Sequence, residues 1–141
     1  MNDISLIIPT HFRHHFLRRI LDYNQKSGFK IFVVDSSKKA FEDKSKYSNV
    51  TYLHFPDTLY FDKMKMAFSR VNTKYSFICA DDDFISIESA KKCALFLDKN
   101  QDYSSAQGHY ISFQYQSSLF PYPTYLSMLN NSISDNSPVS R

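Results

Sequence analysis

The feature that most constrains the fold of this chain is an alternation of two apolar patterns. Residues 4–8 and 31–34 form nearly continuous apolar runs, which are typical of strands buried on both faces of a parallel sheet. Between these runs, apolar residues recur at helical spacing from His11 to about Ser27, and Gly28 supplies a stop signal. The N-terminal part of the chain therefore predicts a strand–helix–strand unit.

The same alternation continues toward the C-terminus and predicts an α/β fold with a doubly wound, mainly parallel, Rossmann-like sheet. Pro and Asp mark the start of the second helix, and Ser86 is a candidate cap for the third. The further elements are expected in this order: a strand over 50–55, a helix from 56–57 to about 71, a strand over 75–80, a helix ending near 99, and a strand within 103–115.

Handedness restricts how these strands can be arranged. If the chain builds outward from the first strand to the third and then returns, right-handed crossovers give the strand order 3-2-1-4, with at least one further strand. Ligands bind such sheets at the carboxyl ends of the strands, beside the point where the order reverses. Pro9-Thr10, Asp35 and Asp81–Asp83 all fall there. At about 4.8 Å per strand, Asp35 and the aspartates lie roughly 10 Å apart, a gap that a nucleoside diphosphate can bridge.

Length and composition indicate one domain. The chain has 141 residues, of which 43% are hydrophobic, enough to bury a single core. We expect the α/β domain over residues 1–115. Residues 116–141 are rich in Ser, Asn, Tyr and Pro, so we expect an irregular or incomplete C-terminal segment there.

Charge and cysteine usage argue against several classes of protein. The net charge is +3 with dispersed Lys and Arg, whereas nucleic-acid binders concentrate basic residues on one face, so no nucleic acid is expected as a partner. Cys79 and Cys93 have neither metal-ligand nor disulfide spacing and are expected to be buried thiols in a reducing compartment. No window approaches the ~20 apolar residues of a membrane span. We expect a cytoplasmic protein without a transmembrane segment, and attachment at a membrane surface stays compatible with the sequence.

Several common catalytic and phosphate-binding motifs are absent from the sequence. Glycine occurs only at positions 28 and 108, so neither a Walker-type phosphate loop nor a Rossmann G-x-G-x-x-G loop can be built. The G-x-S-x-G pattern is also missing. His11 and His15 have a spacing compatible with zinc, but no nearby third ligand is evident.

The strongest chemical signal is the run of three aspartates that follows the fourth expected strand. Mg²⁺ and Mn²⁺ prefer carboxylate oxygens and supply the positive charge that adjacent carboxylates need. In a strand-like conformation Asp81 and Asp83 would share one side, with Asp82 on the other. The alternative is a solvated acidic loop whose charge favours the start of the next helix.

Other candidates have equally simple alternatives. Asp35 ends a buried strand and can accept a hydrogen bond from a base N–H or a ribose hydroxyl, or it can be a turn residue before Ser36-Ser37. Lys63 and Lys65 can reach diphosphate oxygens if their helix packs near the site, or they can be solvated. The basic stretch around Arg13 can be a solvated helix face.

Three stretches together resemble a known family. They are "SLIIPTHFR", "IFVVDSS" and "YSFICADDDF", and in this order and spacing they resemble the nucleotide-binding half of family 2 glycosyltransferases, which have the GT-A fold. The resemblance covers roughly residues 3–115. In the ungapped register Ala80 replaces the first aspartate of the family's D-x-D-type motif, and Lys65 replaces a common asparagine.

The resemblance implies residues for the nucleotide sugar and residues for the metal, and the two sets overlap in the acidic loop. Within that loop two assignments stay open. Either Asp81 and Asp83 form a shifted D-x-D, or Asp82 is the principal metal ligand with Asp81 near the ribose. The residues implied for the nucleotide sugar are Pro9, Thr10, Arg13, Asp35, Lys65, Asp81 and Asp82, and those implied for Mg²⁺ or Mn²⁺ are Asp81, Asp82 and Asp83.

The family's mechanism is direct displacement by an activated acceptor hydroxyl, while the metal stabilises the departing nucleoside diphosphate. Family members normally continue into an acceptor-binding half that carries the general base. This chain ends at Arg141, Asp135 is its only late acid, and no catalytic base can be assigned. We therefore expect a chain truncated relative to the family.

These observations lead to one principal hypothesis and two alternatives. The principal hypothesis is a glycosyltransferase-like domain that binds a nucleotide-diphosphate sugar through a divalent metal, for transfer to an acceptor hydroxyl on a glycan or lipid-linked glycan. The first alternative is a catalytically incomplete domain that only binds nucleotide or another subunit. A sugar nucleotidyltransferase is less favoured, because such enzymes usually open with a Gly-rich loop after the first strand.

Overall fold

The computed structural model describes residues 3–115 and 119–124. The chain forms two compact units, Met1–Ile87 and Glu88–Arg141. The division expected from the sequence, one domain over residues 1–115 and an irregular or incomplete segment over 116–141, stays a prediction.

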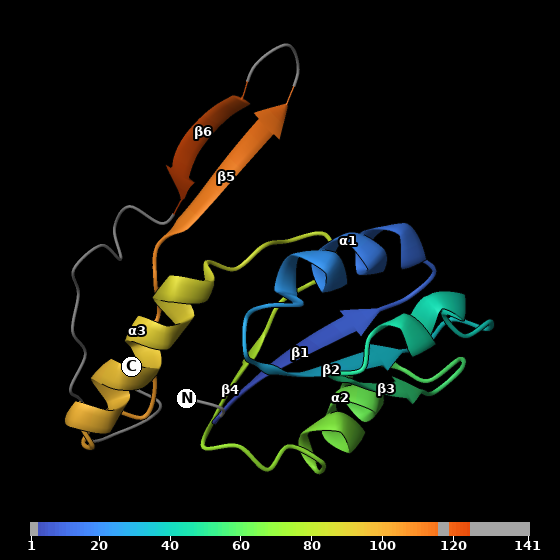
Figure 1. The fold of residues 1–141 in the computed structure, drawn as a ribbon, viewed down its shortest axis with the longest axis horizontal. Helices are drawn as coiled ribbons and strands as arrows, with labels where there is room; N and C mark the ends of the chain where they lie inside the picture. The colour runs from blue at the N-terminus through green and yellow to red at the C-terminus, as the bar shows by residue number, and fades with distance from the viewer. Residues whose placement is uncertain (1–2, 116–118, 125–141) are drawn as a thin grey trace. The chain divides into compact units, whose positions relative to one another are not determined.

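The first unit is built on a four-stranded sheet in which neighbouring strands are parallel. Its strand order, β3-β2-β1-β4, confirms the expected 3-2-1-4 arrangement, with the reversal between β1 and β4. Figure 1 shows α1 and α2 on opposite sides of this sheet. The strands are β1 (Ile4–Thr10), β2 (Lys30–Asp35), β3 (Val50–His54) and β4 (Tyr75–Ile78), and the helices are α1 (His14–Asn24), the 3₁₀ helix η1 (Glu42–Lys46) and α2 (Tyr60–Phe68).

Side-chain alternation along β1 and β2 produces an apolar layer on each face of the sheet. Ile7 lies beside Phe32 in the parallel register, and with Val34 they form one core cluster with Met64 and Ala67 of α2. Residues of the opposite parity face the other way. α1 is amphipathic and buries Leu17, Ile20 and Leu21. Each fully buried aliphatic side chain contributes roughly 1.5–3 kcal/mol, so both layers stabilise the sheet.

Pro9 separates the ends of β1 and β4. β1 was expected to end before Pro9, but it continues to Thr10 beside β2. The Cys79 N–H donates to the Ile7 carbonyl, and the next donor of that ladder would be the N–H that Pro9 lacks. Pairing with β4 therefore stops at Ile78, whereas the sequence analysis expected that strand to reach residue 80.

Left-handed residues shorten both helices relative to the expected ranges. Phe12 has φ 56° and Asp57 has φ 55°, values that an α-helix cannot include. α1 consequently begins at His14 instead of His11, and α2, which also follows the extended Leu59, begins at Tyr60 instead of residues 56–57. Sequence periodicity does not reveal a single left-handed residue, so these boundaries were missed.

The second unit contains α3 (Ile87–Lys99), which begins at the last residue of the first unit, and a hairpin of β5 (Tyr110–Tyr115) and β6 (Leu119–Thr124). β5 confirms the further strand expected within 103–115, but it pairs antiparallel with β6 in a separate sheet. β6 lies within the segment expected to be irregular, and its two prolines are tolerated because a strand of a two-stranded ribbon is an edge strand. The remainder of that segment, 116–118 and 125–141, lies outside the described residues.

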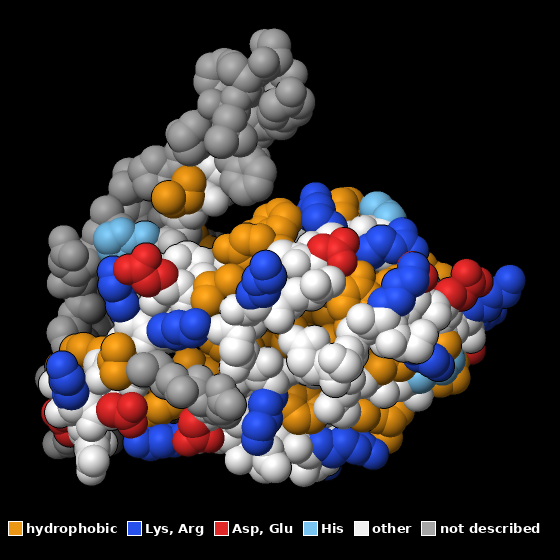
Figure 2. All heavy atoms as spheres, viewed as in Figure 1, with side chains coloured by type: hydrophobic (Ala, Val, Ile, Leu, Met, Phe, Trp, Pro, Cys, Tyr) orange, Lys and Arg blue, Asp and Glu red, His pale blue; other side chains and the backbone are white. Residues whose placement is uncertain are grey.

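The sequence analysis expected dispersed Lys and Arg residues and two buried thiols. Figure 2 shows Lys and Arg side chains spread over the visible face among acidic and hydrophobic ones, in line with the dispersed charge. Cys79 is buried and Cys93 is partly buried, and both are free thiols. Among the described residues, no helix has both the length and the apolar character needed to cross a lipid bilayer.

Candidate functional site

The candidate site begins where β1 ends. Thr10 Oγ1 donates a 2.7 Å hydrogen bond to Asp81 Oδ2, and both residues are buried. On the other side of Thr10, the parallel register places Asp35 at the end of β2. The sheet therefore brings together Thr10, Asp35 and Asp81, three of the predicted site residues, at the reversal of strand order.

The basic start of α1 neutralises the acidic loop. Arg13 precedes the first turn, and its Nη1 donates to Asp82 Oδ2 at 2.8 Å while its Nη2 lies 2.5 Å from Asp81 Oδ1. Arg19 donates to the Asp82 backbone carbonyl at 2.8 Å. The Tyr23 hydroxyl, one turn further, donates to the Ile85 carbonyl. The sequence allowed the basic stretch around Arg13 to be only a solvated helix face. In the structure this stretch contacts the acidic loop.

The three aspartates have different environments. Asp81 is fully buried, whereas Asp82 and Asp83 are exposed. Asp81 Oδ1 has an ion pair with Arg13 but no hydrogen bond in the described structure. The Cys79 thiol lies just before this loop, and burial, together with Asp83, raises its pKa to about 12. This thiol is therefore protonated at neutral pH and unsuited to nucleophilic chemistry.

The donor set fits one kind of metal site. Among residues 3–115 and 119–124, no three His, Cys, Asp or Glu side chains are arranged to enclose a cation. Mg²⁺, however, is commonly held by one or two carboxylates, with water and ligand phosphates completing its shell. The exposed carboxylates of Asp82 and Asp83 fit that second kind of site, whereas Asp81 Oδ1 is buried and paired with Arg13.

Asp35 is surrounded by protein donors. Its Oδ1 accepts the Ser37 N–H at 2.7 Å, and its Oδ2 contacts His14 Nε2 at 2.8 Å and the Tyr52 hydroxyl. Burial acts to raise the pKa of Asp35, but the hydrogen bonds from Ser37 and Tyr52 outweigh it, so the pKa lies below its ordinary value. Burial raises the pKa of the Tyr52 hydroxyl, and the hydrogen bond to Asp35 adds to that effect. Asp35 is therefore an ionised, buried anchor.

Lys63, and not Lys65, reaches the ends of the strands. Lys63 Nζ donates to the Thr10 carbonyl at 2.7 Å and to Ser36 Oγ at 3.0 Å, and the residue is buried. Burial lowers the pKa of Lys63, although the nearby Asp35 and Asp81 partly offset this. Lys65 is exposed on another face of α2. The apolar spacing of Met64, Ala67 and Val71 was a sequence signal that Lys63 lies on the buried face.

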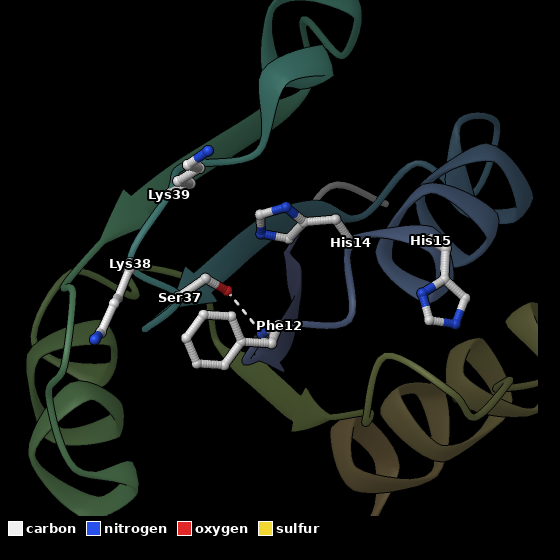
Figure 3. A pocket seen from close by; sticks show the side chains of 6 residues that line it. All are labelled: Phe12, His14, His15, Ser37, Lys38 and Lys39. Carbon is white, nitrogen blue, oxygen red and sulfur yellow. Dashed lines mark hydrogen bonds between the residues drawn. The ribbon is translucent and has the colours of Figure 1, made fainter.

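Two hollows lie beside these residues. The smaller hollow, about 240 Å³, opens where β1 and β4 diverge after Pro9. The larger hollow, about 490 Å³, lies beside the residues that follow β2 (Figure 3). The smaller hollow is lined by Pro9, Thr10, His11, Arg13, Tyr60, Lys63, Ile78 and Ala80, and the larger by Phe12, His14, His15, Ser37, Lys38 and Lys39.

Phe12 is a site residue that the sequence analysis missed. Its backbone is left-handed and its side chain is 59% exposed, while Ser37 Oγ accepts its N–H at 2.7 Å. Such a conformation is uncommon for a bulky residue and is maintained only where the surroundings determine it. In Figure 3 the Phe12 and His14 rings extend toward the Ser37 side, whereas His15 points away from them.

Comparison with known proteins gives the family. A model of glycosyl transferase family 2 matches residues 5–138 of this chain. The crystal structure of S. aureus TarS 1-349 is similar, with a TM-score of 0.59 and 20% sequence identity over 72% of this chain and 33% of that chain. This similarity confirms the expected GT-A-type fold, and this chain spans about a third of the length of the TarS chain. The search of curated proteins found no match. Because the family model covers nearly the whole sequence, the chain belongs to glycosyl transferase family 2.

Proposed function

We propose that this chain is the donor-binding part of a glycosyltransferase, which binds a nucleoside-diphosphate sugar with Mg²⁺ or Mn²⁺ for transfer to an acceptor hydroxyl. The observation that carries the proposal is the convergence of Thr10, Asp35, Asp81 and the cations Arg13 and Lys63 at the reversal of strand order. This is the place where open α/β sheets bind ligands.

The two hollows suit the two ends of such a donor. The larger hollow offers the exposed ring of Phe12, which can pack against a base, and the lysines at 38 and 39. The smaller hollow has a basic lining that suits phosphate oxygens, since Arg13 and Lys63 contribute to it. Lys63 has three donors and uses two of them on Thr10 and Ser36, so one stays available. Lys65 was expected here, and we assign its role to Lys63.

The acidic loop would hold the metal. Asp82 and Asp83 carry exposed carboxylates that a cation can reach, whereas the Asp81 carboxylate is buried. A bound divalent cation would neutralise charge on the diphosphate as it departs. Arg13 keeps the loop ordered through Asp81 and Asp82, and Thr10 orients Asp81 by its hydrogen bond.

Calorimetric titration of the chain with nucleoside diphosphates, with and without Mn²⁺, tests this proposal. We expect Mn²⁺-dependent binding that is lost in the double variant Asp82→Asn, Asp83→Asn. A matched control is Glu88→Gln with Asp102→Asn, which removes the same charge from exposed acids of the second unit. Binding that is independent of Mn²⁺, or equally weakened by both pairs, would contradict the proposal.

A second candidate function is binding without transfer. It is the alternative that the sequence left open, because no catalytic base could be assigned in it. An assay of donor hydrolysis or sugar transfer separates the two. Metal-dependent binding without turnover would support a nucleotide-binding or subunit-interaction role.

A further inference from the structure

One set of contacts between α1 and the acidic loop involves the loop carboxylates. The guanidinium of Arg13 lies 2.8 Å from Asp82 Oδ2 and 2.5 Å from Asp81 Oδ1. The Asp81 carboxylate is buried, but the side chains of Arg13 and Asp82 are both partly exposed. A cation that approaches Asp82 from solvent therefore meets an oxygen that already pairs with Arg13. Because the two positive groups repel each other, they compete for this carboxylate.

A second set of contacts, further along α1, involves the backbone of the same segment. Arg19 Nη2 donates to the Asp82 carbonyl at 2.8 Å. The Tyr23 hydroxyl, one turn later, donates to the Ile85 carbonyl at 3.1 Å. Both bonds end on backbone oxygens, so a cation that takes the side-chain oxygens of the loop leaves these bonds intact.

The ring of Phe84 connects the two backbone contacts. The guanidinium carbon of Arg19 lies 4.8 Å from the centroid of the Phe84 ring and 4.8 Å from that of Phe16. Tyr23 meets the Phe84 ring edge-on, with 5.1 Å between the centroids. A guanidinium can stack on a ring and still donate in its own plane. The stacking therefore restricts Arg19 while it donates to the Asp82 carbonyl.

These two sets of contacts give the arginines opposite effects on a bound cation. Removing Arg13 removes a competitor for the Asp82 carboxylate, so the cation should bind more tightly. Removing Arg19 also removes a positive charge, which by itself would favour the cation. It also releases the backbone of Asp82, however, and a loop that must be ordered on binding has a lower affinity.

We infer that Arg19, stacked on Phe84, is a positioning residue for the acidic loop, and that it holds the backbone of Asp82 while Arg13 gives up the carboxylate to a cation. This inference rests on the proposed function and adds a residue that controls the affinity of the loop for the metal. Arg19 acts through the Asp82 backbone and does not touch the cation. The exchange then requires a rotation of the Arg13 side chain, which lines the smaller hollow, and no opening of the loop.

Titration of the full chain with Mn²⁺ alone, with free Mn²⁺ measured by electron paramagnetic resonance, tests the inference. We expect Arg13→Met to bind Mn²⁺ about 2- to 5-fold more tightly. Arg19→Met should bind it about 3- to 10-fold more weakly, which is opposite to the effect of charge alone. The matched control is Arg18→Met, because Arg18 lies on the same helix but pairs with Asp43 instead of the loop. Its affinity should change less than about twofold.

Two further measurements distinguish positioning from a general role in stability. Arg19→Lys keeps a charged donor and should recover part of the affinity that Arg19→Met loses. Hydrogen exchange at saturating Mn²⁺ should be faster in Arg19→Met at the amides of residues 82–85 only, and unchanged in Arg13→Met. Faster exchange throughout α1 would show a general loss of structure and would overturn the inference.

The outcomes for this inference and for the proposed function differ. If Arg19→Met binds Mn²⁺ as tightly as the unmodified chain, or more tightly, the inference is overturned while the proposed function stands. If Mn²⁺ binds to none of these proteins, with or without a nucleoside diphosphate, the metal dependence in the proposed function fails as well.

Discussion

Two buried carboxylates, Asp35 and Asp81, lie on opposite sides of Thr10 and are held in different ways. Asp35 is held by a backbone N–H, a hydroxyl and an imidazole. Asp81 is held by the Thr10 hydroxyl and by Arg13, whose side chain is 43% exposed. An anionic ligand can compete for an exposed guanidinium, and a cation can compete with it for the carboxylates, but neither easily replaces buried backbone and hydroxyl donors. The Asp35 side is therefore a fixed part of the site, and the acidic loop is its adjustable part.

The largest effect is expected at the fixed side. Asp35→Ala leaves the Ser37 N–H and the Tyr52 hydroxyl without their acceptor in a buried place, at a cost of about 3 kcal/mol in the free energy of unfolding. Urea denaturation measures this loss, with Asp102→Ala as the exposed control. A loss equal to that of the control would refute the assignment of Asp35 as an anchor.

Tyr52→Phe should have a smaller effect on the same side. The Tyr52 hydroxyl donates to Asp35 and accepts the Phe41 N–H at 2.8 Å, so it links β3 to two other segments. We expect the free energy of unfolding to fall by about 1–2 kcal/mol. If Tyr52→Phe adds nothing to the loss measured for Asp35→Ala, the two residues act as one unit; full additivity would argue against this.

Arg13→Ala tests the adjustable side. Because Arg13 is partly exposed, we expect a loss of about 1 kcal/mol, less than at Asp35. The variant leaves the acidic loop without its guanidinium, so Mn²⁺ should raise its thermal midpoint more than that of the unmodified chain. An equal rise in both proteins would show that Arg13 and the cation do not share the loop carboxylates.

The pH dependence of stability separates the two sides further. The pKa of Asp35 is lowered in the folded chain, because the hydrogen bonds from Ser37 and Tyr52 outweigh its burial. Its stabilising contribution is therefore complete above the ordinary pKa of an aspartate and is lost as the pH falls through the lower folded value. The difference in stability between the chain and Asp35→Asn should begin to shrink below about pH 4 and keep shrinking as the pH falls further. Parallel curves down to pH 2 would contradict this.

The smallest effect is expected on thiol labelling. Burial raises the pKa of Cys79 to about 12, so alkylation at pH 8 should label the partly buried Cys93 and spare Cys79. Arg13→Ala should speed labelling of Cys79 if the loop opens, and mass spectrometry of the labelled peptides measures both rates. Rapid labelling of Cys79 in the unmodified chain would rule out a closed loop.

Much of the fold was predictable because it depends on patterns that local sequence carries. Apolar runs over residues 4–8 and 31–34 indicate buried strands, and the helical spacing between them indicates a crossover helix. Handedness then allows the strand order to be inferred. The left-handed Phe12 and Asp57 escaped prediction, since neither position carries the glycine that usually marks such a conformation.

The sequence by itself determined that Thr10, Asp35 and the three aspartates lie at or just beyond the carboxyl ends of strands, and that these ends meet at the reversal of strand order. Only the tertiary structure decided which side chains contact them. Arg13 pairs with the acidic loop, Lys63 donates to the Thr10 carbonyl, and His14 contacts Asp35. The physical reason is that strand pairing follows from short apolar patterns, whereas the partner of a buried charge depends on distances between segments far apart in the chain. Those distances are set by how α1 and α2 pack on the sheet.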